Sequence, residues 1–218
     1  MKRVMIASSL LLALSSVLSS PAIGETAHAS PPFGVLLDDK RVWTYDVVTE
    51  PAGKPTGQVT LSVRAIETHG AYTLVDLDAK GNDQVTGFTL LIGPKGVREI
   101  LSIGREDRDE ASFRLAYDKK YLPHIYLPAP LKKQQLKADL DRFGEDNRTY
   151  KVTGVLTKPN PHTWRMTWKG SYTVAEGEDA RAKTKTRYEA TVDFDPGVGF
   201  TLICPADGET PRCLRFHP

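Results

Sequence analysis

Apolar side chains recur at every second position over much of Arg41 to Ile103, and this period is the feature that most constrains the fold. The clearest segment alternates apolar and polar residues in the order Val59, Thr60, Leu61, Ser62, Val63, Arg64 and Ala65. Successive side chains of a β-strand point to opposite faces of the sheet, whereas an α-helix repeats about every 3.6 residues. The alternation therefore predicts strands that bury one face.

The same alternation returns near residue 149 and is more regular there. One segment places its large apolar side chains on a single face, namely Trp164, Met166, Trp168, Tyr172 and Val174. In the earlier segment 71–79 the apolar parity switches at Val75, which predicts a β-bulge or a strand that changes faces. Short turns separate these segments, so we predict an all-β, mainly antiparallel meander of about 11 strands. A sheet of that size curls, and we expect a half-open or closed barrel.

The strand pattern is interrupted in the middle of the chain, over residues 118–147. Before the interruption, three alternating side chains predict a sixth strand: Phe113, Leu115 and Tyr117. Within it, three prolines occur between Tyr121 and Leu131: Pro123, Pro128 and Pro130. Proline cannot donate a backbone hydrogen bond, so this stretch is expected to be an extended crossing segment rather than a central strand.

A short amphipathic helix is expected directly after the prolines, over Leu131 to Phe143. Leu136, Leu140 and Phe143 recur at helical spacing, and Gly144 follows where a C-cap is favoured. We expect this helix to cover an open end or face of the sheet. Two interpretations remain open, a fixed cover and a movable lid over a ligand cavity.

The N-terminus has the pattern of a secretory signal peptide. Lys2 and Arg3 precede an apolar stretch, residues 4–18, and small residues follow it. Cleavage after Gly24 or after Ala29 fits this pattern, and we favour the second, which makes residues 1–29 the signal peptide. The apolar stretch is shorter than the roughly 20 residues of a membrane span, which argues against an anchor helix. We therefore expect a periplasmic or secreted protein with one β-rich domain, residues 30–218.

The charge of the chain argues against a nucleic-acid-binding function. The full sequence has 29 basic and 27 acidic side chains and a formal net charge of +2. Removal of residues 1–29 takes away Lys2, Arg3 and Glu25, which leaves a net charge near +1. Proteins that bind phosphate backbones need a strongly basic surface. No apolar segment of the mature sequence is long enough to predict a transmembrane helix.

The two cysteines, Cys204 and Cys213, are expected to form a disulfide. An exported chain reaches an oxidising compartment, where such a pair persists. The chain-entropy model gives this short loop about 2.5 to 3 kcal/mol of stabilisation. No histidine has ligand spacing to either cysteine, so a metal site is not predicted and no cofactor is expected.

Motifs of known catalytic sites are scarce in this sequence. It contains no Gly-x-Ser-x-Gly and no His-Glu-x-x-His. Two pairs of aspartates at i, i+2 spacing could in principle serve acid–base chemistry or hold a metal: Asp76 with Asp78, and Asp193 with Asp195. We interpret both pairs as solvated residues on outward faces. The first pair also begins a weak calcium-loop pattern, but Lys80 occupies a ligand position.

Several features together resemble the bacterial outer-membrane lipoprotein carrier and receptor proteins. They are the signal peptide, the nearly continuous meander, the opening segment Val42-Trp43-Thr44-Tyr45 and the helical interruption in the middle of the chain. The resemblance implies a half-barrel of antiparallel strands that is covered by helices and holds acyl chains. It implies no individual functional residue, because it includes no specific motif.

The sequence thus favours a non-enzymatic binding or carrier module for an apolar ligand, such as a lipid or a lipidated protein. The residues expected to line the apolar concavity are Trp43, Tyr45, Trp164, Met166, Trp168 and Tyr172. These side chains could instead form an ordinary core, since aromatic residues dominate many cores. The alternative function is a protein-interaction or structural role in the cell envelope, and the third is hydrolysis of envelope polymers.

Overall fold

The computed structural model describes residues 32–82, 85–100, 103–104, 108–118, 125–141, 148–176, 182–205 and 212–218. The predicted signal peptide, residues 1–29, lies outside the described residues. Those residues form one 3-10 helix, η1 (Gly34–Leu37), and one α-helix, α1 (Glu110–Asp118). They also form twelve strands: β1 (Val42–Val48), β2 (Pro55–His69), β3 (Tyr72–Lys80), β4 (Phe88–Gly93), β5 (Gly96–Ile100), β6 (Tyr126–Pro128), β7 (Gln134–Asp141), β8 (Arg148–Thr157), β9 (Trp164–Glu176), β10 (Ala182–Asp195), β11 (Gly199–Cys204) and β12 (Cys213–Phe216).

All twelve strands belong to one antiparallel sheet, in the order β6-β5-β4-β3-β2-β1-β12-β11-β10-β9-β8-β7. Two meanders, β1–β6 and β7–β12, meet in the middle of the sheet, where β1 pairs with β12. The strands β6 and β7 are the two edges, and the sheet is not closed into a barrel. The predicted all-β antiparallel class is confirmed, with twelve strands rather than about eleven.

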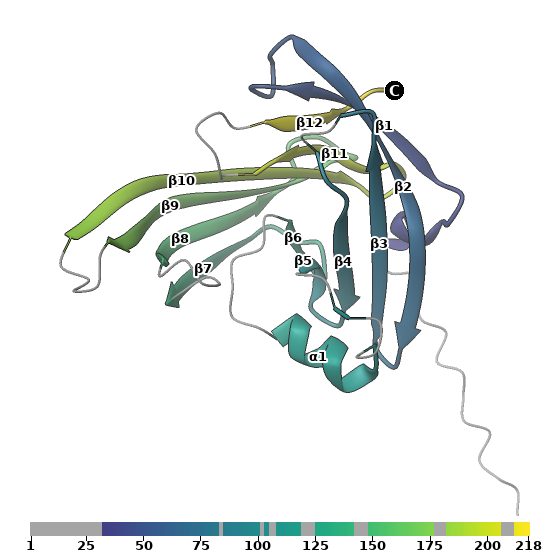
Figure 1. The fold of residues 1–218 in the computed structure, drawn as a ribbon, viewed down its shortest axis with the longest axis horizontal. Helices are drawn as coiled ribbons and strands as arrows, with labels where there is room; N and C mark the ends of the chain where they lie inside the picture. Colours follow the sequence, from purple (N-terminus) through teal and green to yellow (C-terminus); the bar gives the residue numbers. More distant parts are fainter. Residues whose placement is uncertain are drawn as a thin grey trace, which may run out of the picture.

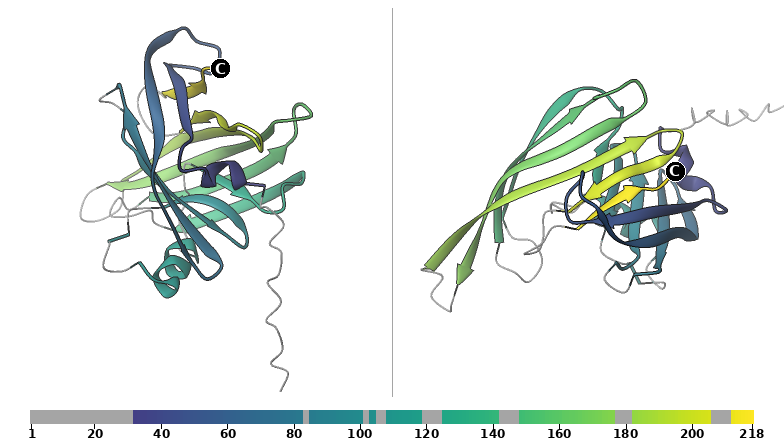
Figure 2. Two further views of the ribbon diagram at one scale, coloured as in Figure 1. Left: turned by 90° about the vertical axis from the view of Figure 1, so that its right-hand side faces the viewer. Right: turned by 90° about the horizontal axis from the view of Figure 1, so that it is seen from above.

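The two meanders face each other across a shared core. In Figure 1, β3 and β4 run upright while β8, β9 and β10 run across the view, and the views in Figure 2 show β7–β10 curving away from β1 and β2. One cluster of buried side chains joins both meanders, including Val75, Leu90 and Leu127 from the first and Leu156 and Met166 from the second. We call this cluster the main core, and the sheet face that supplies it the inner face.

Helix α1 lies where a sixth strand was predicted, so that prediction is wrong. Phe113 and Tyr117 are buried one turn apart, whereas Leu115 between them is 68% exposed. The helix begins after Asp109, whose carboxylate accepts a hydrogen bond from the backbone N–H of Ser112 at 2.7 Å. Phe113, Leu115 and Tyr117 fit the spacing of two of a strand, and Phe113 and Tyr117 also fit the spacing of four of a helix. The N-terminal cap and the packing of α1 favour the helix.

Helix α1 covers the outer face of the first meander. Its Phe113 and Tyr117 cluster with Leu74 of β3 and Leu91 of β4. The next residue along β3, Val75, points to the main core instead. Apolar residues therefore line both faces of β3, which explains the parity switch at Val75. The accompanying β-bulge lies on the partner strand β2, between Val63 and Ala65.

The segment in which we predicted the amphipathic helix contains strand β7 instead. All eight residues of β7 pair with β8, from Gln134 opposite Leu156 to Asp141 opposite Thr149. Leu136 and Leu140 are four residues apart, a spacing that fits a helix face and also alternate positions of a strand. Pairing with the neighbouring strand overrides the helical pattern here. The predicted cap, Gly144, lies outside the described residues.

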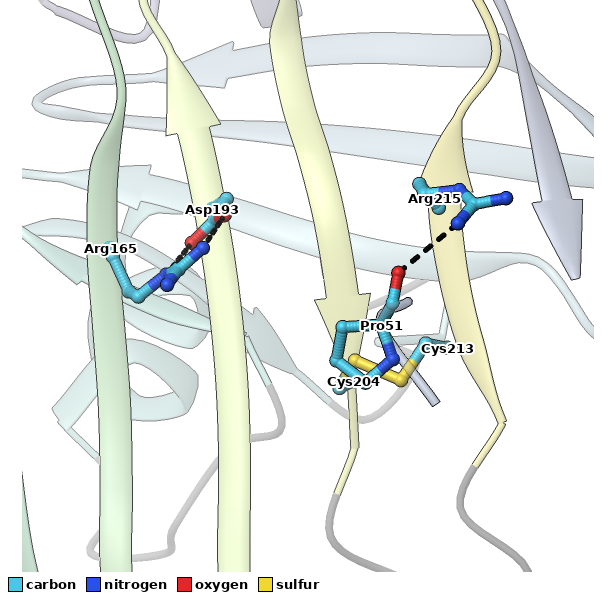
Figure 3. Close-up of a disulfide and its surroundings, with 6 residues drawn as sticks. All are labelled: Pro51, Arg165, Asp193, Cys204, Cys213 and Arg215. Atoms are coloured by element: carbon cyan, nitrogen blue, oxygen red, sulfur yellow. Dashed lines mark hydrogen bonds and ion pairs between the residues drawn. A yellow bond between two sulfur atoms is a disulfide. The ribbon is translucent and has the colours of Figure 1, made fainter. Parts of the chain in front are cut away.

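The disulfide between Cys204 and Cys213 is present, as predicted, and ties the end of β11 to the start of β12. Val48 and Leu202 pack against it in a small separate cluster. Arg215 of β12 donates a hydrogen bond at 3.2 Å to the backbone oxygen of Pro51, which brings the β1–β2 turn next to the disulfide (Figure 3). This region therefore joins the first and last strands of the fold.

Candidate functional site

Strand β9 places four of the predicted site residues on the inner face. Trp164, Met166, Trp168 and Tyr172 occupy alternate positions, with Gly170 between the last two. Met166 is fully buried and Trp168 is 4% exposed, whereas Trp164 and Tyr172 at the two ends of the row are only partly buried. The outward side chain of Lys169 on the same strand is exposed. Alternation thus brings these four residues into one row, as predicted.

Two further tyrosines extend this row across the neighbouring strands. Tyr150 of β8 lies directly opposite Tyr172, with ring centroids 5.5 Å apart. Tyr188 of β10 contacts Tyr150 edge to face, with centroids 5.6 Å apart. The alternation marks both as inward, but only the register of the strands shows that they adjoin Tyr172. We call the inner-face set Trp164, Met166, Trp168, Tyr172, Tyr150 and Tyr188 the aromatic face.

A tyrosine from the first meander contacts the aromatic face from the opposite edge of the sheet. Tyr126 of edge strand β6 is half-buried, and its ring centroid lies 6.4 Å from that of Trp168. Burial raises the pKa of the Tyr126 hydroxyl, although the charges of Arg98 and Lys95 oppose this shift. Tyr126 lies in the segment that was expected to be an extended proline-rich crossing, and this contact was not predicted because it joins β6 and β9, which are far apart in the sequence.

Trp43 and Tyr45 of β1 lie in the main core, but they hold the β10–β11 hairpin rather than extend the aromatic face. The Trp43 indole N–H donates to the backbone oxygen of Val198 at 2.7 Å. The Tyr45 hydroxyl donates to the backbone oxygen of Phe200 at 2.8 Å, and burial raises the pKa of this hydroxyl. Both polar groups are therefore used within the fold.

The indole of Trp168 differs from that of Trp43. Its Nε1 atom is buried and has no hydrogen-bond acceptor within the described part of the chain. The six-membered ring lies over Gly154 of β8: a Cβ atom added to Gly154 would stand 2.7 Å from Cζ3 of Trp168. Gly154 thus makes room for the indole on the inner face. Nothing in the alternation of the sequence signals an unpaired indole N–H.

The two aspartate pairs are not the simple solvated pairs we predicted. Asp76 is 2% exposed and accepts hydrogen bonds from Arg64, Arg108 and Thr89 at 3.0, 3.1 and 2.7 Å. Its partner Asp78 is more exposed and lies 3.6 Å from Arg64. The interpretation failed for Asp76 because cationic side chains cover it on the outer face.

Asp193 is also buried, at 7% exposure, and Arg165 holds it through two hydrogen bonds of 2.7 Å (Figure 3). The other member of this pair, Asp195, accepts a hydrogen bond from the backbone N–H of Gly197 in the β10–β11 turn. Asp76 and Asp193 are thus engaged by arginines, and Asp195 by a turn. This leaves the aromatic face as the candidate site.

The remaining observations bear on metals, membranes and relatives. Within the described residues, no group of three or more His, Cys, Asp or Glu side chains is arranged to hold a metal ion. None of the helices in those residues has the length and apolar character needed to cross a membrane. Comparison of the chain with protein-family models, with curated proteins and with solved structures finds no match.

Proposed function

We propose that this protein is a non-enzymatic binding or carrier module for an apolar ligand, a lipid or an acyl chain, in the cell envelope. The observation that carries the proposal is the aromatic face on the inside of a large sheet that is not closed. Binding sites for such ligands are concave and mostly apolar, with a few polar groups that fix orientation. Trp164 and Tyr172, which are only partly buried, supply apolar surface, and the buried indole N–H of Trp168 supplies one such polar group.

The gap between the edge strands β6 and β7 is the proposed entrance. Residues 129–133 connect the two edges, so the ends of these strands lie within about 20 Å of each other. Apolar side chains that are only partly buried against the main core occur on both sides, including Tyr126 on β6, Leu131 in the connection and Leu136 on β7. An apolar ligand that entered here would bury these side chains further, and burial of apolar surface is favourable.

The cell envelope is proposed as the location because of two features at opposite ends of the chain. The N-terminal sequence has the pattern of an export signal. The Cys204–Cys213 disulfide near the C-terminus suits an oxidising compartment. A carrier that operates between membranes would need both export and a shielded apolar site.

Native mass spectrometry of the full-length protein, produced in its own host and purified from the envelope, tests the proposal. We expect a mass increment that corresponds to a lipid, which organic extraction removes. Leu136→Glu places a charge on the proposed entrance and should abolish the increment, because burial of an unpaired charge is costly. Gln135→Glu places the same charge on an exposed neighbour in β7 and should retain it. Ligand-free protein that also fails to bind added lysophospholipid would refute the function.

A second candidate is a protein-interaction role for the edge strand β7. This strand is eight residues long and is hydrogen-bonded to β8 on one side only in the described structure. Such an edge can pair with a strand of another protein. The exposed Lys137 on β7 disfavours unselective pairing, as charges on edge strands do. A stoichiometric protein partner in the same mass spectra, without lipid, would favour this function instead.

A further inference from the structure

The indole N–H of Trp168 is a buried hydrogen-bond donor without an acceptor in the described structure. The side chain is 4% exposed, so bulk water does not solvate this group. A buried donor left unpaired is costly, and buried polar groups in native proteins are nearly always paired. By contrast, the N–H of Trp43, which is equally buried, has the backbone oxygen of Val198 as its acceptor. The unpaired donor of Trp168 therefore needs an explanation.

The residues directly beside Trp168 on the two neighbouring strands are small and apolar. Its cross-strand neighbours are Gly154 on β8 and Ala190 on β10. The Cε3–Cζ3 edge of the indole faces Gly154, at 2.8 and 2.7 Å from the position that a Cβ atom would take. The Nε1 atom is on the opposite edge of the indole ring system from Cε3 and Cζ3, and it is not among the atoms nearest to Gly154. Tyr126 lies across from the indole, with ring centroids 6.4 Å apart.

We propose that Trp168 determines which apolar ligands this site accepts, by donating its indole N–H to a neutral carbonyl oxygen of the ligand. The inference rests on the proposed function and names its ligand class: acyl esters or amides, rather than hydrocarbon or ether-linked chains. A neutral carbonyl suits this position better than a carboxylate, because a buried charge in apolar surroundings is costly. A neutral carbonyl also suits this position better than a chain without an acceptor, because such a chain leaves the indole N–H unpaired.

A matched pair of lipids tests this selection directly. 1-Palmitoyl lysophosphatidylcholine and its 1-O-hexadecyl ether analogue have the same head group, and only the first has a carbonyl at the chain. One hydrogen bond between neutral groups is worth about 1 kcal/mol, so the wild-type protein should bind the ester about fivefold more tightly. Isothermal titration below the micelle concentration measures both constants.

Substitution of single tryptophans separates hydrogen bonding from apolar contact. Trp168→Phe keeps an aromatic ring and removes the donor, so the ratio of the two affinities should fall to about one. Trp164→Phe makes the same change at the partly exposed end of the same row. It should weaken both lipids alike and leave the ratio at about five. An unchanged ratio in Trp168→Phe would overturn the inference.

Nuclear magnetic resonance of the wild-type protein gives a readout that does not depend on a variant folding. With ¹⁵N-labelled indoles, the Nε1–H signal of Trp168 should move downfield when the ester is added and should stay in place with the ether. Equal movement with both lipids would refute the role of Trp168 while the proposed function stands. Failure of the wild-type protein to bind either lipid would instead refute the function itself.

Discussion

The carboxylate of Asp76 is buried and paired with two arginines, so its neutralisation should lower the free energy of unfolding. The side chain is 3% exposed, and its oxygens accept hydrogen bonds from Arg64, Arg108 and Thr89. Arg108 is itself 12% exposed and also pairs with Glu67. Asp76→Asn keeps the size of the side chain but removes the charge that two arginines share.

We expect Asp76→Asn to lower the free energy of unfolding by about 3 kcal/mol at pH 7. Removal of one partner of a buried ion pair costs about 3 to 5 kcal/mol, because the other charge stays buried. The lower end applies here, since Glu67 still pairs with Arg108 and the side chain of Arg64 is 55% exposed. Asp78→Asn is the matched control on the same strand. Its carboxylate is 42% exposed, so we expect a loss of no more than about 0.5 kcal/mol.

The difference between wild type and Asp76→Asn should depend on pH. Burial alone raises the pKa of Asp76, but the hydrogen bonds from Thr89, Arg64 and Arg108 and the charge of Arg108 outweigh it, so the pKa lies below its ordinary value. A lowered pKa in the folded state means that the stabilisation is present above about pH 4 and is lost as the pH falls through the folded-state value.

Urea denaturation, followed by circular dichroism between pH 7 and pH 2, measures this dependence. The difference in unfolding free energy between wild type and Asp76→Asn should be about 3 kcal/mol at pH 7. It should shrink as the pH falls below about 4, because the wild-type carboxylate then also becomes neutral. A loss below 1 kcal/mol at pH 7 would show that the ion cluster adds little stability. A gap that stays constant down to pH 2 would show that a packing change, and not charge, is the cause.

Three other changes test separate parts of the structure. Replacement of Cys204 and Cys213 by serine should lower the free energy of unfolding by about 2.6 kcal/mol, from a sequence separation of 9, and equal urea midpoints would contradict this. Gly199→Ala should cost at least about 1 kcal/mol by thermal unfolding, because Gly199 has φ +110° and a Cβ there would approach Trp43 Nε1 to 2.9 Å. Tyr126→Ala should speed the association of lysophospholipid in stopped-flow fluorescence, since the ring lies beside Trp168, with centroids 6.4 Å apart; an unchanged rate would place the entrance elsewhere.

The fold class could be predicted because period-two alternation reflects local geometry and needs no knowledge of the partners of each strand. An example is the row of Trp164, Met166 and Trp168. The alternation predicts that these residues share one face of a strand, and in the structure they do. The disulfide could be predicted because the chain has only two cysteines. These features depend on residue types and spacings that can be read directly along the sequence.

The helix could not be placed from the sequence, because its position depends on distant contacts. Phe113 and Tyr117 form a helix face only because Leu74 and Leu91 present an apolar outer face to them. Leu136 in β7 belongs to a strand because β8 offers a partner along its whole length. In both places the spacing of the apolar residues fits helix and strand, so tertiary contacts decide.

The candidate site was predictable in part, for the same reason. Alternation indicates that Trp168 and Tyr172 point inward, but not that Tyr126 from β6 meets them. It also does not indicate that Trp43 has an acceptor for its indole N–H while Trp168 has none in the described residues. Such differences arise from strand register and from turns. They are the features on which ligand selection depends in our proposal.

The separation of the two apolar clusters leads to a last prediction, that stability and ligand selection can be changed independently. Phe113 is fully buried between α1 and the outer face, whereas Trp168 belongs to the main core on the inner face. Phe113→Ala should therefore lower the free energy of unfolding by about 3 kcal/mol, as large-to-small changes in cores do. It should leave the ester-to-ether affinity ratio at about five, because no group that contacts Trp168 is altered. A ratio that falls with stability would show that α1 and the aromatic face act as one unit.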